Sequence, residues 1–319
     1  RKGKIGLRSK DHPNELVDVE KCVIAVEEIN VLLAEVRSFF LKERLSGEYS
    51  GCFKEIIIRA TTFGDNSISF VLNSDFSKLR EAQEKIRDFS GITTAKNVGI
   101  TYNSMEEDTS GKEDEEVSED SSSKDSFVVK GTDRICEKLL EKDFYFPVQG
   151  FFQNNTFVAE KMQDYVKMML KKYPTKKAIL LDLYAGVGTF GIINSENFAK
   201  VIMVESFKPG AEMTVINLKE NKVKNAEMLA KEAHQLRKLK LSSPLYVITD
   251  PPRSGMDERV IRQLNELKPE VLVYISCNHL QLGKDLLKFK NYEIKSMALF
   301  DLFPQTPHLE AVVELVRKG

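Results

Sequence analysis

The second half of the chain alternates short apolar runs with single helical patterns, and this alternation restricts the fold more than any other feature of the sequence. The expected strands fall within residues 178–190, 201–205, 245–250, 271–277, 292–300 and 310–317, and the expected helices at 156–172, 210–221, 257–267 and 281–289. Apolar strands that are joined by one helix each are typical of a parallel sheet, because the helix returns the chain to the same edge. The pattern therefore predicts an α/β protein with a doubly wound sheet.

The first part of the chain has a different pattern. Helical spacing and strand-like runs are mixed there, with helices expected at 26–45 and 76–89 and strands at 53–60, 67–73 and 92–102. Such a mixture indicates an α+β unit. We therefore expect two domains, a smaller α+β domain over residues 1–148 and a catalytic domain over residues 149–319.

Residues 105–125 interrupt the first domain with a strongly acidic segment. The segment carries ten acidic residues and two lysines, a net charge of −8, so the remainder of the chain carries +7. It has almost no apolar side chains to bury, and we expect it to be disordered. The positive charge of the remainder is compatible with a polyanionic partner.

The composition excludes several classes of protein. No run of about 18 apolar residues suggests a membrane span. The four cysteines include no CxxC pair, and no Cys/His cluster has the spacing of zinc ligands. Scattered cysteines of this kind are typical of reduced thiols in an intracellular protein, so we expect a cytoplasmic protein with no metal site inside this chain.

Polar residues stand where the expected strands end. In a doubly wound sheet the active site lies at the carboxyl ends of the strands, and Asp182, Glu205, Asp250 and Cys277 all fall at or just before such ends. Residues 182–191, DLYAGVGTFG, match the letters of a GxGxxG turn, and Glu205 is placed to bind a ribose diol. The letters alone leave a dinucleotide and a methyl-donor nucleoside both open.

The DPPR turn at 250–253 points to a planar substrate. Two prolines make the turn rigid, and they can hold Asp250 and Arg253 against a flat ring. In methyltransferases that act on the amino groups of bases, the corresponding turn ends in an aromatic residue that stacks on the base. An arginine at this position disfavours N-methylation.

Cys277 and Glu310 are the candidate reactive groups. A lone cysteine is usually a small buried apolar residue, but a strand-end position beside ligand-binding turns favours a nucleophile. Arg253 is a candidate for the positive neighbour that would favour the thiolate. Glu310 opens an otherwise apolar strand, where a carboxylate is costly unless it has a partner or a role, so it is a candidate general base. His308 is the alternative base.

The segment FFQNN precedes the first helix of the catalytic domain. Asn155 or Thr156 can cap that helix. Gln153 lies outside the cap, and its amide can pair with the edge of a uracil or with the carboxylate of a methionine group.

The segments FFQNN, DLYAGVGTFG, VE, DPPR, SCN and FPQTPHLE occur in this order, and together they resemble the 5-methyluridine RNA methyltransferase family, which modifies tRNA and ribosomal RNA. The resemblance implies a Rossmann-like S-adenosylmethionine (SAM) methyltransferase sheet with an antiparallel last strand, preceded by an RNA-binding or central domain. It implies Cys277 as the nucleophile and Glu310 as the base. The residues that it assigns to the cofactor are Gln153, Tyr184, Thr189, Glu205 and Asp250, and those assigned to the uridine are Arg253 and Gln153.

The sequence departs from the family at several positions. His279 stands where proline is common, Thr189 stands where asparagine is common, and the adenine contact expected within 225–232 stays open. Many relatives carry an iron–sulfur cluster whose last ligand lies in a segment like VDVEKC. Cys22 is therefore a possible cluster ligand if three more thiolates lie upstream of Arg1.

These expectations predict methylation of C5 of a uridine in RNA, with the tRNA T-loop favoured over ribosomal RNA. Two other functions stay open: an N-methyltransferase of bases or proteins, and an RNA-binding or RNA-folding protein with a vestigial site. The DPPR turn disfavours the first of these, and the pair Cys277 and Glu310 disfavours the second. No feature of the sequence predicts a protein partner.

Overall fold

The computed structural model of this chain describes residues 4–9, 12, 15–42, 49, 51–103, 126–239, 241 and 244–319. The acidic segment at 105–125 lies outside these residues, so its expected disorder stays a prediction. The chain divides into two compact units, Arg1–Ile135 and Cys136–Gly319. None of the helices in the described part is long and apolar enough to cross a membrane.

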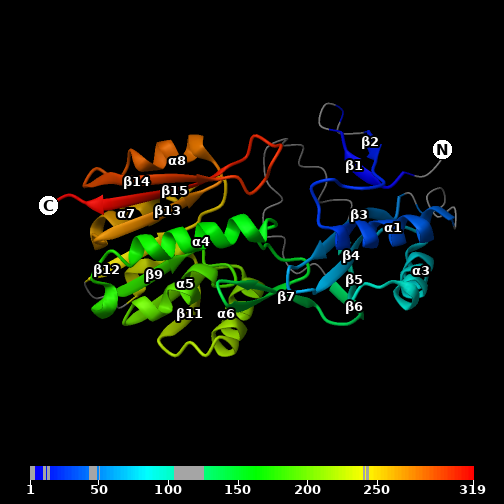
Figure 1. Ribbon diagram of the computed structural model, residues 1–319, viewed down its shortest axis with the longest axis horizontal. Helices are drawn as coiled ribbons and strands as arrows, with labels where there is room; N and C mark the ends of the chain where they lie inside the picture. The colour runs from blue at the N-terminus through cyan, green and yellow to red at the C-terminus, as the bar shows by residue number, and fades with distance from the viewer. Residues whose placement is uncertain are drawn as a thin grey trace. The chain divides into compact units, whose positions relative to one another are not determined.

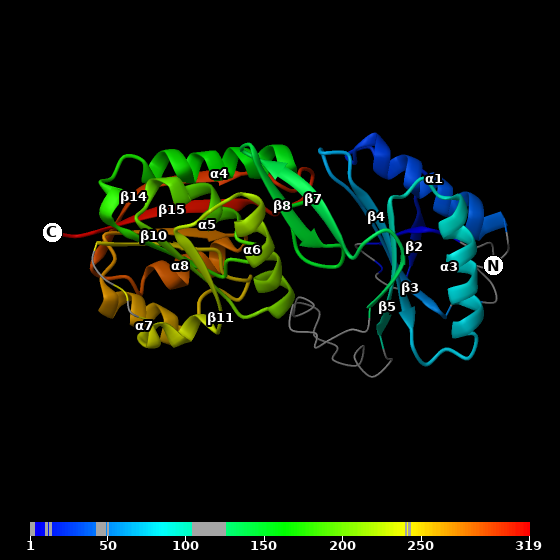
Figure 2. The same ribbon diagram turned by 90° about the horizontal axis from the view of Figure 1, so that it is seen from below.

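The first unit is an α+β fold. A four-stranded sheet has the order β3-β4-β5-β6, and two helices, α1 and α3, cover one of its faces (Figure 2). The bounds are β1 Gly6–Arg8, β2 Leu16–Asp18, α1 Glu27–Lys42, β3 Phe53–Ala60, β4 Asn66–Asn73, α3 Leu79–Ile92, β5 Asn97–Asn103 and β6 Ser126–Lys130. Leu32, Phe40 and Phe89 from the helices pack on Phe70 and Ile100 of the sheet, and all five are buried.

The second unit is the doubly wound α/β sheet that the sequence predicted. Its seven strands have the order β11-β10-β9-β12-β13-β15-β14 (Figure 1). The strand bounds are β9 Ile179–Leu183, β10 Lys200–Glu205, β11 Ala226–Ala230, β12 Leu245–Thr249, β13 Val271–Ser276, β14 Tyr292–Phe300 and β15 Glu310–Arg317. The first five strands are parallel, and β15 is antiparallel to both of its neighbours, as the resemblance implied.

Helices cover both faces of this sheet, with α4, α5 and α6 on one face and α7 and α8 on the other (Figure 2). The bounds are α4 Thr156–Leu170, α5 Thr189–Asn194, α6 Lys208–Glu220, α7 Glu258–Leu267 and α8 His279–Leu286. The Asn155 side chain caps α4 by accepting from Val158 N. Buried side chains of α7 and α8 join the strands in one apolar core, which fixes the strand ends that carry the site.

A hairpin that the sequence did not predict precedes the catalytic sheet. It consists of β7 (Arg134–Leu139) and β8 (Lys142–Pro147). Asn217 and Asn221 of α6 each bind its backbone: Tyr145 N donates to Asn217 Oδ1 at 2.8 Å, and Asp143 N to Asn221 Oδ1 at 3.0 Å. Nearly all of the hairpin therefore belongs to the second compact unit, which begins at Cys136, whereas the sequence placed a boundary after residue 148.

Candidate active site

The strand register gathers the sequence-predicted residues at one edge of the sheet. Leu183 at the end of β9 lies opposite Val204 of β10 and Thr249 of β12, and Thr249 lies opposite Tyr274 of β13. Because these strands are parallel, Asp182, Glu205, Asp250 and Cys277 lie at the same edge, where such folds bind ligands.

The glycine turn after β9 has backbone conformations that favour glycine. Gly186 has φ +55° and Gly188 has φ +86°. A Cβ on Gly188 would lie 2.9 Å from a methyl carbon of Thr214, so both the conformation and the space exclude a side chain there. The Thr214 hydroxyl donates to Gly186 O at 2.9 Å and ties the turn to α6.

Glu205 binds the glycine turn directly. Its carboxylate accepts from Gly186 N at 2.8 Å and from Phe207 N at 2.7 Å, and burial raises its pKa. The sequence assigned Glu205 to a ribose diol. A carboxylate has about four acceptor positions, so these two bonds leave acceptors for ribose hydroxyls while they fix the turn.

Several buried side-chain oxygens of the second unit lack a hydrogen-bond partner among the described residues. They include Asp182 Oδ1, Gln153 Oε1 and Gln163 Oε1. Asp182 is buried, its other oxygen accepts from Gly191 N at 2.8 Å, and burial raises its pKa to about 7. Unpaired buried acceptors are costly. They fit a ligand that brings donors, such as the amino and hydroxyl groups of SAM.

Gln163 was not predicted from the sequence. It lies within α4 and is buried, and its Nε2 donates to Thr189 Oγ1 at 3.1 Å. Thr189 is the residue that replaces the family's usual asparagine at the start of α5. Gln163 therefore orients a hydroxyl at the end of the glycine turn. Tyr184, which precedes the turn, has φ +59° and packs on the core below it.

The backbone before Gln153 is held by a stacked pair of rings. Phe152 and Phe146 of β8 lie with their centroids 4.2 Å apart and an interplanar angle of 7°. This contact anchors the segment that carries Gln153 to the hairpin.

The proline turn and the loop before β15 meet at Arg253. Arg253 Nη2 lies 3.4 Å from His308 Nδ1, and Asn278 Nδ2 donates to Arg253 O at 3.0 Å. Asn278 directly follows Cys277, so the turn that carries Arg253 lies against the strand end that carries the thiol. The side chain of His308 therefore contacts Arg253, which was predicted to bind the uridine.

Cys277 directly follows β13, and Glu310 opens the adjacent antiparallel strand β15. Ser276, the last residue of β13, pairs with Ala311 of β15, so Cys277 and Glu310 each lie one position beyond the last pair of this ladder. Glu310 is only 5% exposed, and burial raises its pKa to about 7, while Cys277 is partly exposed. A carboxyl group with a pKa near neutrality suits proton transfer.

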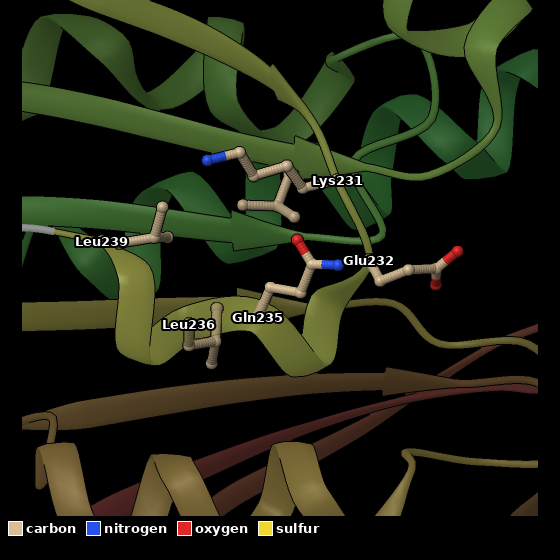
Figure 3. Close-up of a pocket in the computed structure, with 6 residues that line it drawn as sticks. Lys231, Glu232, Gln235, Leu236 and Leu239 are labelled. Atoms are coloured by element: carbon tan, nitrogen blue, oxygen red, sulfur yellow. The ribbon is translucent and has the colours of Figure 1, made fainter.

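A small surface hollow adjoins the end of β10 (Figure 3). Its lining residues are Val204, Lys231, Glu232, Gln235, Leu236 and Leu239. In Figure 3 the Gln235 amide turns toward Lys231, whereas the Glu232 carboxylate turns away from the leucines. The hollow overlaps the segment at 225–232 where the sequence left the adenine contact open.

Cys22 does not form a metal site with the other described residues. Its backbone is bound on both sides by Asn30, with Cys22 N donating to Asn30 Oδ1 at 2.8 Å. The part of the chain that the structure describes holds no group of three His, Cys, Asp or Glu residues suited to a metal ion. One thiolate does not fit an iron–sulfur cluster, which usually takes four.

Two curated relatives are similar to this chain over nearly its whole length. The chain is 30% identical over 317 residues to the tRNA (uracil(54)-C(5))-methyltransferase of Pyrococcus horikoshii, which covers 98% of this chain and 70% of that protein. It is 26% identical over 320 residues to an uncharacterized RNA methyltransferase of Nanoarchaeum equitans, covering 99% of this chain and 67% of that protein.

A solved structure shares the fold. It is the Pyrococcus abyssi tRNA (uracil-54, C5)-methyltransferase in complex with S-adenosyl-L-homocysteine (SAH), with a TM-score of 0.74 and 24% identity over 98% of this chain and 73% of that one. A family model described as tRNA (Uracil-5-)-methyltransferase matches residues 121–318. This match spans well over half of the chain, which therefore belongs to the tRNA (uracil-5-)-methyltransferase family and is a SAM-dependent RNA methyltransferase.

Proposed function

We propose that this protein methylates C5 of a uridine in RNA through a covalent bond between Cys277 Sγ and C6 of the uracil. The observation that carries the proposal is that Cys277 and the buried Glu310, whose pKa is raised to about 7, each lie one position beyond the last pair, Ser276 and Ala311, of two adjacent strands. A nucleophile and a base at the same end of two adjacent strands can act on neighbouring carbons of one ring.

The chemistry requires both groups. The Cys277 thiolate adds to C6, and the electron pair of the C5–C6 double bond makes C5 nucleophilic. Bound SAM would provide the electrophilic methyl group that C5 attacks, with SAH as the leaving product. Glu310 then takes the C5 proton, the C5–C6 double bond reforms, and the bond between C6 and Cys277 Sγ breaks. The uridine must leave any base stack to reach these groups.

The cofactor would lie along the glycine turn. Glu205 would accept from the ribose hydroxyls, and Thr189, Tyr184, Asp250 and Gln153 would line the remaining contacts. The unpaired acceptors of Asp182 and Gln153 fit the donor groups of that ligand. Arg253, with Gln153, would hold the uracil against Cys277.

The substrate that we favour is the T-loop uridine of tRNA. The name of the Pyrococcus horikoshii relative specifies uracil 54 of tRNA, and this chain matches 70% of that protein. Ribosomal RNA is the second candidate, because the family resemblance covers both substrates. An RNA substrate of either kind is consistent with the expected cytoplasmic location.

The test is methyluridine mapping by mass spectrometry after incubation of the protein with total RNA and isotope-labelled SAM. We expect label in 5-methyluridine, at the T-loop position of tRNA. Label in 5-methyluridine at a ribosomal RNA site would identify ribosomal RNA, rather than tRNA, as the substrate. Label on an amino group would replace the reaction by N-methylation, and RNA binding without label would leave an RNA-binding protein with a vestigial site.

Variants of the two reactive residues test the mechanism. Cys277→Ala should abolish both methylation and any RNA–protein adduct. Glu310→Gln should still allow addition and methyl transfer, but the C5 proton stays, so a methylated adduct should persist through denaturing electrophoresis. An adduct in the Cys277→Ala variant would assign the nucleophile elsewhere. Normal turnover by Glu310→Gln without an adduct would favour His308 as the base.

The iron–sulfur proposal for Cys22 concerns the whole gene product. A cluster would need three thiolates beyond this chain's described residues. Iron and sulfide analysis of the complete protein, purified without oxygen, tests it with a Cys22→Ser variant as control. Absence of iron from the complete protein would leave Cys22 as an ordinary thiol.

A further inference from the structure

We infer that Asp285 is a positioning residue that fixes the turn carrying Asp250 and Arg253 against the strand that ends at Cys277. The inference rests on the proposed function, because that function gives Arg253 and Cys277 their roles. Asp285 lies on α8, outside the motifs that the sequence analysis identified, and is fully buried.

The Asp285 carboxylate joins three segments. Its Oδ2 accepts from Met256 N at 3.0 Å and from the Tyr274 hydroxyl at 2.8 Å, and its Oδ1 accepts from Gln281 Nε2 at 3.0 Å. Lys288 Nζ lies 3.5 Å from Oδ1. Met256 lies three residues after Arg253, and Tyr274 lies on β13 three residues before Cys277.

The turn passes so close to Asp285 that only glycine fits beside it. Gly255 has φ +81°, and a Cβ built there would lie 2.5 Å from Asp285 Oδ2. Both the backbone conformation and the space therefore require glycine at this position. The contact brings the backbone of the turn, rather than a flexible side chain, against the carboxylate.

A second hydrogen bond holds the same turn, from Asn278 at the N-cap of α8, about two turns of helix before Asp285. Asn278 donates from Nδ2 to Arg253 O at 3.0 Å, and its Oδ1 accepts from Gln281 N at the start of α8. Asp285 and Asn278 thus fix both ends of the segment between Arg253 and Met256. Tyr274, which bonds to Asp285, precedes Cys277 in the sequence, and Asn278 follows it.

The chemical consequence is geometric. Attack of Cys277 on C6 requires the uracil to be held at near-contact distance, and a displacement of about 1 Å at such a site can reduce the rate by about 100-fold. A buried carboxylate is costly unless it is fully hydrogen bonded, as Asp285 is. Its bonds to both the turn and the strand couple the group that holds the uracil to the group that attacks it.

The experiment compares Asp285→Asn with Glu314→Gln. Glu314 is a matched control because it is also a buried carboxylate of this sheet and accepts from two hydroxyls, those of Tyr173 and Ser296. Neither residue has a role in the proposed chemistry. The measurements are thermal stability, SAH affinity and the rate of adduct formation with unmodified tRNA transcripts at saturating RNA and SAM. Adduct formation is measured with Glu310→Gln added to each protein, so that the adduct persists.

We expect both variants to lose stability and to bind SAH within about twofold of wild type. Only Asp285→Asn should slow adduct formation at saturating RNA, by about tenfold or more. An equal rate for the two variants, or a loss of SAH affinity as large as the loss of rate, would overturn the inference. If Asp285→Asn does not fold, Tyr274→Phe takes its place, because it removes the hydroxyl that donates to Asp285. It should also slow adduct formation.

The two proposals fail in distinguishable ways. If the Glu310→Gln protein forms no Cys277-dependent adduct, the proposed function is wrong. If it forms the adduct and Asp285→Asn in the same background forms it equally fast, the proposed function stands and the positioning role of Asp285 is wrong.

Discussion

At the residue scale, the two carboxyl groups whose pKa is raised to about 7 link the site to the stability of the protein. Asp182 and Glu310 are both buried, and desolvation disfavours their charged forms. Their pKa values in an unfolded chain would lie near 4, so at neutral pH the folded state holds protons that the unfolded state releases. Each group therefore contributes stability that is fully present below about pH 4 and is lost as the pH rises through 7.

Glu310→Gln should remove part of this pH dependence. Glutamine has no proton to lose, so the free energy of unfolding of the variant should fall less between pH 4 and pH 9 than that of wild type. We expect the difference between the two proteins to shift by about 2–3 kcal/mol in favour of the variant over this range. Urea unfolding at several pH values between 4 and 9 measures the effect. Glu293→Gln, at an exposed position on β14, is the control and should follow wild type. Parallel curves for Glu310→Gln and wild type would contradict the raised pKa.

The bond between Gln163 and Thr189 predicts a coupled effect on the cofactor. Gln163→Leu removes the donor to the Thr189 hydroxyl, and a hydrogen bond of this kind contributes about 1 kcal/mol, so SAH affinity should fall about fivefold. Thr189→Val should have a similar effect, and the double variant should be little worse than either, because both remove one interaction.

Calorimetric titration with SAH measures all three variants. Gln83→Leu is the matched control, because it removes a hydrogen bond of 2.9 Å that the Gln83 side-chain amide donates to the Tyr102 hydroxyl in the first unit. Its SAH affinity should equal that of wild type. Fully additive losses for the Gln163 and Thr189 variants would show that the two side chains act independently.

At the element scale, Asn217 of α6 connects the hairpin β7–β8 to the glycine turn after β9. Its Nδ2 donates to Tyr145 O and to Val187 O, both at 2.9 Å, while its Oδ1 accepts from Tyr145 N. The side chain is fully buried. One amide therefore pairs the backbone of β8 and also holds the turn between Gly186 and Gly188.

Asn217→Ala should affect both stability and cofactor binding. Three backbone groups lose their partner, and we expect a loss of about 2–4 kcal/mol in unfolding free energy with weaker SAH binding. Asn265→Ala is the control, because Asn265 Nδ2 also donates to two backbone carbonyls, those of Ile261 and Lys288, away from the turn. The control should lose stability only. Unchanged SAH affinity in Asn217→Ala would show that the bond from Asn217 to the glycine turn does not affect cofactor binding.

The elements that sequence patterns predicted are those whose own residues determine them. The strands at 53–60, 292–300 and 310–317 have the predicted bounds, because their apolar and β-branched residues favour strands locally. The strand β11 was missed because Ala226–Ala230 contains no β-branched residue and pairs with β10 only through the fold. The hairpin β7–β8 was missed because Leu140 and Glu141, rather than glycine or asparagine, have positive φ in its turn.

The candidate site divides in the same way. Residues in turns at strand ends, such as Cys277 and Glu205, could be identified because parallel strands share one ligand-binding edge. Gln163 and Asp285 could not, because a polar residue in a helix shows no sign in the sequence of whether it faces solvent or the site. Only the packing of α4 and α8 on the sheet brings their side chains to Thr189 and Met256.

At the scale of the whole molecule, charge is distributed unevenly along the chain. Residues 105–125, outside the described part, carry −8 and the remainder carries +7, although the net charge of −1 suggests a nearly neutral protein. RNA binding depends strongly on phosphate neutralisation by basic residues, and acidic residues oppose it. The acidic segment should therefore weaken the attraction of the whole chain for RNA.

Deletion of residues 105–125 should leave folding intact and should not weaken RNA binding. The change raises the net charge from −1 to +7, so we expect affinity for tRNA transcripts to stay equal or to rise, with the largest gain at low salt. Filter binding at several salt concentrations measures this, alongside thermal unfolding and methyl transfer. A variant of the same length, with the ten acidic residues replaced by serine and glycine, separates charge from chain length and should behave like the deletion. Weaker RNA binding by the deletion, or a large loss of thermal stability, would show that the segment makes contacts of its own.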